Sequence, residues 1–121
     1  MKKVVLTVDD SRTIREMLRT ALNEAGMEVL QAEDGMHGLE VLQGSTPDVI
    51  VTDINMPRLD GFGFIEGVRA DPRHRATPVL VLTTESDAAK KQRARDAGAT
   101  GWIVKPFDPV KLVEAVRRVA A

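Results

Sequence analysis

Five short apolar runs rich in Val, Ile and Leu recur along this chain of 121 residues. They are KVVLTV (3–8), MEVL (27–30), DVIVTD (48–53), PVLVLTT (78–84) and GWIVK (101–105). Three of the runs are apolar nearly throughout, instead of alternating with polar residues. That pattern is typical of strands covered on both faces in a parallel sheet. The runs therefore predict a sheet buried between two layers of other structure.

Helical patterns separate these runs, and the first and the last are the clearest. In the first, apolar residues recur with the period of an α-helix at Ile14, Met17, Leu18, Ala21, Leu22 and Ala25. Ser11 or Asp10 can cap its start, and Gly26 its end. The last begins with Asp108 as N-cap and Pro109 at the first helical position. Its inward stripe is Leu112, Ala115, Val116 and Val119. Strands alternating with helices predict an α/β fold with an open, doubly wound, five-stranded parallel sheet.

Length and composition narrow the class of protein. A chain of 121 residues is long enough for one domain, which we place at 1–121. The formal net charge of -1 creates no overall attraction to nucleic acid or to acidic membranes. The absence of Cys excludes a disulfide framework, a thiolate nucleophile and the usual zinc sites. The first apolar run is too short for a signal peptide or a membrane span, so we expect a cytoplasmic protein. His37 and His74 lie in polar sequence and are predicted to be surface residues.

Polar side chains with complementary chemistry follow four of the five predicted strands. They are Asp9 and Asp10, then Asp53, then Thr83 and Thr84, and finally Lys105. Ligands of open α/β sheets bind beyond the carboxyl ends of the strands, where the strand order reverses. The sequence therefore predicts that three carboxylates, two hydroxyl groups and one lysine meet at one edge of the sheet. The acids of QAEDG (31–35), after the remaining strand, are better explained as a helix cap.

This set of side chains suits phosphoryl chemistry with a divalent cation. Three carboxylates held together repel one another unless a cation joins them. Because all the ligands are oxygens, the natural cation is Mg²⁺, which also accepts phosphate oxygens. The Asp53 carboxylate can act as a nucleophile and form an aspartyl phosphate. Lys105 and the Thr83 hydroxyl can then bind oxygens of the transferred group.

Rival motifs are absent or incomplete. No G-x-x-x-x-G-K-[ST] or G-x-G-x-x-G sequence is present, so no loop can cradle a nucleotide phosphate. The DINMPRLDG stretch begins like a calcium loop, but Pro57 and Arg58 occupy positions that need a ligand and a glycine. One Trp, three Phe and no Tyr do not provide the aromatic surface for base stacking, so we expect no nucleic-acid partner.

Four segments together resemble the receiver domain of response regulators. They are VDD (8–10), TDINMPRLDG (52–61), VLTT (81–84) and GWIVKPF (101–107), in the order and at the spacing of that family. The resemblance covers the whole chain. It implies a (βα)₅ flavodoxin-like fold with strand order 2-1-3-4-5.

The resemblance also implies a role for each matching residue. Asp53 would be the phosphoacceptor. Asp9, Asp10 and Asp53 would hold Mg²⁺, and Asn55 would add its backbone carbonyl. Two further implied positions are the switch hydroxyl of Thr83 and the phosphate-binding Lys105, which would be joined to Pro106 by a cis peptide bond.

The output surface is predicted from Trp102 and the helical segment before it. Trp102 stands where the family has its switch aromatic, although a core aromatic on an edge strand is the alternative. The segment SDAAKKQRARDAG (86–98) has only alanines to pack on the sheet, so it is weakly anchored. Its charged face is explained by solvation or by a partner. We assign the switch and output surface to Thr83, Thr84, Trp102, Lys91 and Arg95.

These residues favour a signalling switch over a phosphohydrolase or a flavin carrier. We expect a stand-alone, monomeric response regulator that is phosphorylated by a histidine kinase similar to CheA, is not otherwise an enzyme and carries no output domain. VDDSRTIR (8–15) and AEDGMHGLEVL (32–42) most resemble CheY-like chemotaxis proteins, which bind a FliM-like flagellar motor switch protein or a phosphatase. A phosphorelay intermediate or phosphate sink is the alternative. A small aspartyl-phosphate phosphohydrolase is disfavoured, because Asn55 stands where that class needs an acid. A flavodoxin-like FMN carrier is disfavoured by the acids of the first loop.

Overall fold

The computed structural model describes residues 2–120. The five strands are β1 (Val4–Val8), β2 (Glu28–Ala32), β3 (Val49–Thr52), β4 (Val79–Thr83) and β5 (Gly101–Val104). The helices are α1 (Arg12–Glu24), α2 (Gly35–Gln43), α3 (Gly61–Ala70), α4 (Ala88–Ala97) and α5 (Pro109–Ala120), with a short 3₁₀ helix η1 at Pro72–His74. The strands and helices alternate along the chain, as the apolar runs predicted.

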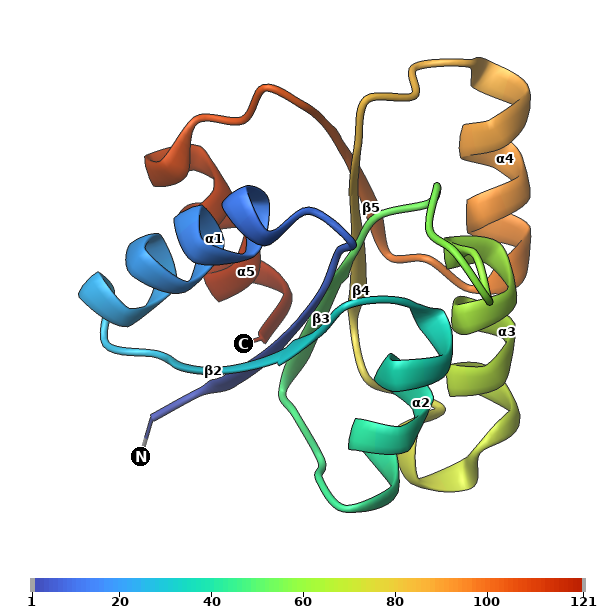
Figure 1. Ribbon diagram of the computed structural model, residues 1–121, viewed down its shortest axis with the longest axis horizontal. Coiled ribbons are helices and arrows are strands. Elements are labelled where there is room, and N and C mark those ends of the chain that lie inside the picture. The colour runs from blue at the N-terminus through green and yellow to red at the C-terminus, as the bar shows by residue number, and fades with distance from the viewer. Residues whose placement is uncertain (1, 121) are drawn as a thin grey trace.

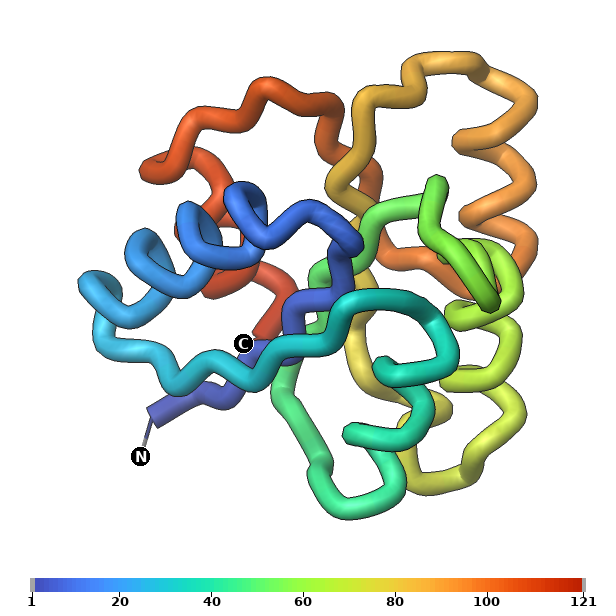
Figure 2. Tube along the Cα trace, viewed as in Figure 1, coloured from blue at the N-terminus to red at the C-terminus, as the bar shows by residue number. Residues whose placement is uncertain are grey.

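All strands are parallel and their order is β2-β1-β3-β4-β5, which confirms the predicted fold. Helices α1 and α5 cover one face of the sheet, and α2, α3 and α4 cover the other (Figure 1). The same two layers can be followed along the tube in Figure 2. Strand β1 pairs with β2 on one side and with β3 on the other. The chain therefore changes direction across the sheet between β1 and β3, and this is where the strand order reverses.

The central strands explain why the sequence shows uninterrupted apolar runs. Every residue of β3 and β4 is buried. Val49, Val51, Leu80 and Leu82 belong to the core beneath α1 and α5. Ile50, Val79 and Val81 belong to the core beneath α2, α3 and α4. Side chains alternate between the faces of a strand, so a sheet covered on both faces needs apolar residues at every position.

The predicted helix starts are confirmed, whereas the C-cap of α1 is Ala25 and the predicted Gly26 is the residue after it, with a φ of 86°. Ser11 is the N-cap of α1, where its side chain accepts a hydrogen bond from the Ile14 N–H. Asp34 caps α2 in the same way. Asp108 accepts a hydrogen bond from the Val110 N–H at the start of α5. Each oxygen satisfies a backbone N–H that has no partner within its own helix.

Two residues lie differently from the prediction. Met17 has 46% of its surface exposed, because it lies at the edge of the apolar stripe of α1. His74 is buried instead of lying at the surface. Nε2 of its ring lies 3.0 Å from the Leu42 carbonyl oxygen. The residues next to His74 in the sequence are polar and gave no sign that its side chain is buried. The contact that accompanies its burial comes from Leu42, near the end of α2. None of the helices within residues 2–120 is long and apolar enough to cross a membrane.

Candidate functional site

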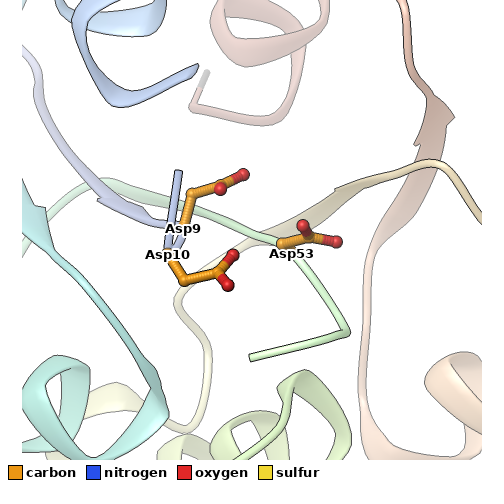
Figure 3. Close-up of side chains that lie close together, drawn as sticks. All are labelled: Asp9, Asp10 and Asp53. Carbon is orange, nitrogen blue, oxygen red and sulfur yellow. The ribbon is translucent and has the colours of Figure 1, made fainter. Parts of the chain in front are cut away.

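Three carboxylates gather at the carboxyl ends of β1 and β3, where the strand order reverses (Figure 3). Each of Asp9, Asp10 and Asp53 offers an oxygen, and these oxygens lie within 4.8 Å of one another. The strands pair in register up to Val8 and Thr52, so the residues that follow lie side by side. Asp9 and Asp53 are buried and Asp10 is exposed. The predicted meeting of the three acids is therefore present.

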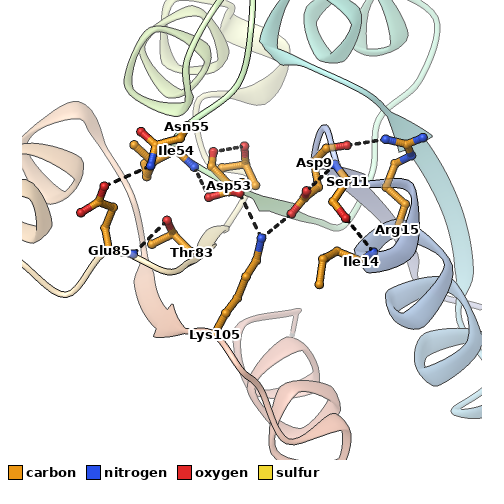
Figure 4. A network of polar contacts seen from close by, with 11 residues as sticks. Asp9, Ser11, Ile14, Arg15, Asp53, Ile54, Asn55, Thr83, Glu85 and Lys105 are labelled. Carbon is orange, nitrogen blue, oxygen red and sulfur yellow. Dashed lines mark hydrogen bonds and ion pairs between the residues drawn. The ribbon is translucent and has the colours of Figure 1, made fainter.

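Backbone N–H groups fix one oxygen of each buried carboxylate. Oδ1 of Asp9 accepts a hydrogen bond of 2.9 Å from the Ser11 N–H. Oδ1 of Asp53 accepts one of 2.7 Å from the Ile54 N–H. The second oxygens of both residues point toward the centre of the site (Figure 4). The rigid ends of the two strands thus present one free oxygen each to a cation.

Lys105 supplies that cation in this structure. Its Nζ donates to Oδ2 of Asp9 at 2.8 Å and to Oδ2 of Asp53 at 3.0 Å (Figure 4). The Lys105–Pro106 peptide bond is cis, as the resemblance implied. Asp9 and Lys105 are separated by 96 positions in the sequence. Only the sheet brings them together, and it does so at the edge predicted from the strand ends.

The site contains three carboxylates and one ammonium group. Burial raises the pKa of the Asp9 carboxyl above its ordinary value of 3.8, although the Lys105 hydrogen bond opposes this. The nearby charge of Asp53 adds to the rise. Burial alone would lower the pKa of Lys105, but its hydrogen bonds to Asp9 and Asp53 outweigh that effect and raise it. One ammonium serves two carboxylates, with Asp10 beside them, so the site carries excess negative charge.

The raised pKa of Lys105 leads to a prediction about alkaline stability. The ordinary value is 10.5, and the folded value lies above it. The stabilisation from this cation is therefore fully present below pH 10.5 and is lost as the pH rises through the folded pKa. We expect the free energy of unfolding to fall over that range, and to fall less in Lys105→Met. Denaturant titrations across the range measure this. An equal fall in Lys105→Met and in the exposed control Lys111→Met would contradict the prediction.

The side chains of the site fit Mg²⁺. The donors are hard carboxylate oxygens, two of them buried, and their excess negative charge requires a cation. Asp9, Asp10 and Asp53 would hold the ion. Asn55 follows two residues after Asp53, and the role of its backbone carbonyl as a further ligand stays a prediction.

Thr83 and Thr84 lie at the end of β4 and differ in exposure. Thr83 is fully buried and its Oγ1 accepts a hydrogen bond of 3.3 Å from the Glu85 N–H. Thr84 is exposed. Figure 4 shows Thr83 on the same side of the sheet edge as Asp53 and Lys105, although its hydroxyl forms no hydrogen bond to either of them. A switching role for either residue stays a prediction.

Glu85 joins the site to the output segment, and the sequence analysis missed it. Its Oε1 accepts a hydrogen bond from Asn55 Nδ2 at 3.0 Å and forms an ion pair with Lys90 Nζ at 3.1 Å. These contacts lower the pKa of Glu85, with the Asn55 hydrogen bond contributing most. Its backbone carbonyl accepts a hydrogen bond of 3.1 Å from Trp102 Nε1. An acid two residues after Thr83, on the loop that leads to α4, was the available signal.

The predicted output residues lie together beside β5. Trp102 is partly buried and packs against the core under α4. Together with Lys91 and Arg95 it lines a small hollow of about 40 Å³ between α4 and β5. In α4 only Ala94 is buried, as expected of a helix that has only alanines to pack on the sheet. The use of this surface for output stays a prediction.

A second contact missed from the sequence holds the loop after β3. The Arg58 guanidinium donates to both carboxylate oxygens of Asp34, at 2.7 and 2.9 Å. Arg58 has a φ of 65°, in the left-handed region that non-glycine residues rarely adopt. The Gly35 N–H also donates to the Leu59 carbonyl at 3.1 Å. The loop that contains Asn55 is therefore tied to the start of α2.

Replacing Arg58 with Ala should weaken Mg²⁺ binding without removing any ligand. The variant loses both hydrogen bonds to Asp34 and keeps the strained φ, so the loop should become mobile. We expect a decrease in Mg²⁺ affinity of less than about tenfold, because the contact acts through the backbone. Arg73→Ala is the control, because the Arg73 side chain is as exposed as that of Arg58 and pairs with Asp71 away from the site. Calorimetric titration that gives the same affinity for both variants would count against the clamp.

Fold and site together define a doubly wound α/β domain with an acidic, lysine-bridged cation site where its strand order reverses. Residues 5–117 match the family model of the response regulator receiver domain, and the chain belongs to this family.

Individual relatives agree with this assignment. The chain is 39% identical over 117 residues to chemotaxis protein CheY1 of Helicobacter pylori strain J99, covering 95% of this chain and 94% of that protein. The crystal structure of the chemotaxis response regulator CheY4 of Vibrio cholerae superimposes with a TM-score of 0.93 at 45% identity, covering 98% and 99% of the two chains. The probable transcriptional regulator ycf27 of Guillardia theta is 38% identical over 98% of this chain. The chain spans only 45% of that regulator, about half its length.

Proposed function

We propose that this receiver domain is a switch that is phosphorylated on Asp53 with Mg²⁺ as cofactor. The observation that carries the proposal is the bridge from Lys105 to Asp9 and Asp53 within the acid cluster. A carboxylate oxygen of Asp53 attacks the phosphorus of a phosphohistidine on a histidine kinase. The P–N bond breaks, and the imidazole leaving group takes a proton from solvent. The product is an aspartyl phosphate.

The residues around Asp53 assist this transfer in different ways. The Lys105 ammonium already contacts an oxygen of Asp53, so it is placed to bind the phosphoryl group that joins this carboxylate. It would act as a point charge. The Asp9 and Asp53 carboxylates are held in place by backbone N–H groups, so little reorganisation is needed. When bound by Asp9, Asp10 and Asp53, Mg²⁺ would neutralise the charge that builds up on the phosphoryl oxygens. Water later hydrolyses the aspartyl phosphate, and we propose no other catalytic activity.

The phosphoryl group would alter the contacts of Thr83 and Glu85. A phosphoryl oxygen on Asp53 is a stronger acceptor for the Thr83 hydroxyl than any group it now contacts. Movement of Thr83 would release the Glu85 N–H that it holds and displace the loop to which Trp102 is bonded. A bias of about 1–3 kcal/mol is enough to shift a two-state population roughly 5- to 150-fold.

Trp102 fluorescence tests this switch directly, because it is the only tryptophan of the chain. Adding Mg²⁺ and beryllofluoride, a mimic of the phosphoryl group, should change the emission and the accessibility of Trp102 to a quencher. Thr83→Ala should reduce the change strongly, because it removes the hydroxyl that transmits the movement. Thr20→Ala is the control, since Thr20 is an exposed threonine of α1 outside the predicted output surface. Equal quenching of Trp102 in both states of the wild type would make it a core aromatic and not a switch.

Chemotaxis is the pathway that the relatives support best. CheY1 and CheY4 are chemotaxis proteins, and both are covered nearly completely by this chain. We infer a kinase similar to CheA as phosphodonor and a FliM-like motor switch protein or a phosphatase as the partner of the phosphorylated form. Binding of the phosphorylated and unphosphorylated protein to a motor-switch peptide should differ. Phosphorylation by the kinase with no difference in peptide binding would instead favour a phosphate sink or relay.

A further inference from the structure

A hollow of about 360 Å³ is lined by residues of α1 and α5 and by the C-cap of α1. These two helices lie on the sheet face opposite to α4 (Figure 1). The apolar lining of the hollow includes Ala21 of α1, Ala25 at the C-cap of α1 and Val113 of α5. Val110, at the mouth of the hollow, has 66% of its surface exposed, the largest value among the exposed large hydrophobic residues of the described chain. None of the carboxylates of the site lines it. The apolar surface is therefore separate from the phosphorylation site.

The charged groups around this hollow are mainly acidic. Glu24 of α1 and Glu114 of α5 both line it and are both exposed. Within residues 2–120, neither of them forms an ion pair. The cation in the lining is Arg117, and its guanidinium already donates to the Ala25 carbonyl at 3.1 Å. The hollow thus combines an apolar floor with two carboxylates that form no ion pair within residues 2–120 and one arginine that is hydrogen-bonded to a backbone carbonyl.

We propose that this hollow binds a segment of a partner protein that carries one bulky apolar side chain flanked by Lys or Arg. The apolar side chain would cover Val110 and fill the hollow, where it removes apolar surface from water. The flanking cations would pair with Glu24 and Glu114. A second copy of the chain is a poorer occupant, because a two-fold contact here would place these acids against the same acids of its mate.

Peptide selection with matched variants tests the proposal without requiring phosphorylation. A phage-displayed library of short random peptides is selected against the unphosphorylated protein, and the selected peptides are titrated by fluorescence anisotropy. We expect peptides with one bulky apolar residue between Lys or Arg residues. Val110→Asp should weaken their binding by about tenfold or more. An acid in the first turn of α5 is favourable for the helix, so this variant should fold. Met36→Asp, on the other face of the sheet, should bind like wild type.

Charge reversal examines the second half of the proposal. Glu114→Lys should weaken the same peptides by about tenfold, and Glu40→Lys on α2 should not. Peptides that lack basic residues, or that bind Val110→Asp and Glu114→Lys as well as wild type, would overturn the proposal. So would a dimer detected by sedimentation that Val110→Asp abolishes, because the hollow would then belong to a second copy. Failure of phosphorylation at Asp53 would leave these results unaffected.

Discussion

Replacing Asp53 with Asn is expected to reduce phosphoryl incorporation from a small phosphodonor by about 100-fold or more, which corresponds to about 2.7 kcal/mol or more in activation free energy. The amide oxygen of Asn is neutral and is a poor nucleophile toward phosphorus. The side chain has nearly the same size, and the Ile54 N–H can still donate to its oxygen. The fold should therefore persist, with only the charge removed.

The control for this variant is Asp96→Asn, which removes an exposed carboxylate on α4. Its incorporation should equal that of wild type. Circular dichroism should show that both variants are folded. Undiminished incorporation in Asp53→Asn would show that another residue accepts the phosphoryl group, and the assignment of the site would then be wrong.

Replacing Lys105 with Met should make the stability of the protein depend on Mg²⁺. Without the ammonium, Asp9 and Asp53 lose the cation that both now contact. Removing one partner of a buried charge cluster typically decreases the free energy of unfolding by about 3 kcal/mol. Mg²⁺ should restore most of this loss, because it binds the folded state only. Its affinity should exceed that of the wild type, since the ammonium no longer competes for the same oxygens.

Denaturant titration with and without Mg²⁺ measures this effect, and Lys111→Met on α5 is the exposed control. At low pH the destabilisation should shrink, because the carboxyl groups can take up protons instead of remaining as unpaired charges. If Lys105→Met has the stability and the Mg²⁺ affinity of wild type, the lysine bridge does not balance the charge of the site.

The positions of the acids could be predicted because they follow from periodicity and topology alone. Uninterrupted apolar runs are required for strands buried on both faces, and parallel strands bring their carboxyl ends to one edge. Asp9, Asp53 and Lys105 each follow such a run directly. Their convergence in the structure is therefore a consequence of the sheet and needs no further information from the loops.

The contacts of Glu85 and Arg58 could not be predicted in the same way. Each depends on the path of a loop, and no periodicity fixes that path. Arg58 reaches Asp34 only because its backbone adopts a left-handed φ, which its residue type does not suggest. His74 was assigned to the surface because its neighbours are polar. The end of α2, which buries it, is distant in the sequence.

Because α4 buries little of its surface, the contacts of the loop before it contribute to holding it in place. Only Ala94 is buried in this helix, while Glu85 connects its first turn to Asn55 beside the site. Exposed ion pairs such as Lys90–Glu85 contribute little stability, so a small change at the site can rearrange them. The proposed switch would act through this segment, in which packing does not fix a single position.

Chemical mapping of the phosphorylated residue tests the central claim most directly. The protein is treated with a small phosphodonor and Mg²⁺, the aspartyl phosphate is reduced with borohydride, and the modified residue is located by peptide mass spectrometry. We predict modification at Asp53, and its loss when Mg²⁺ is removed by a chelator. Modification at a different residue, or equal modification of Asp53 without Mg²⁺, would contradict the account.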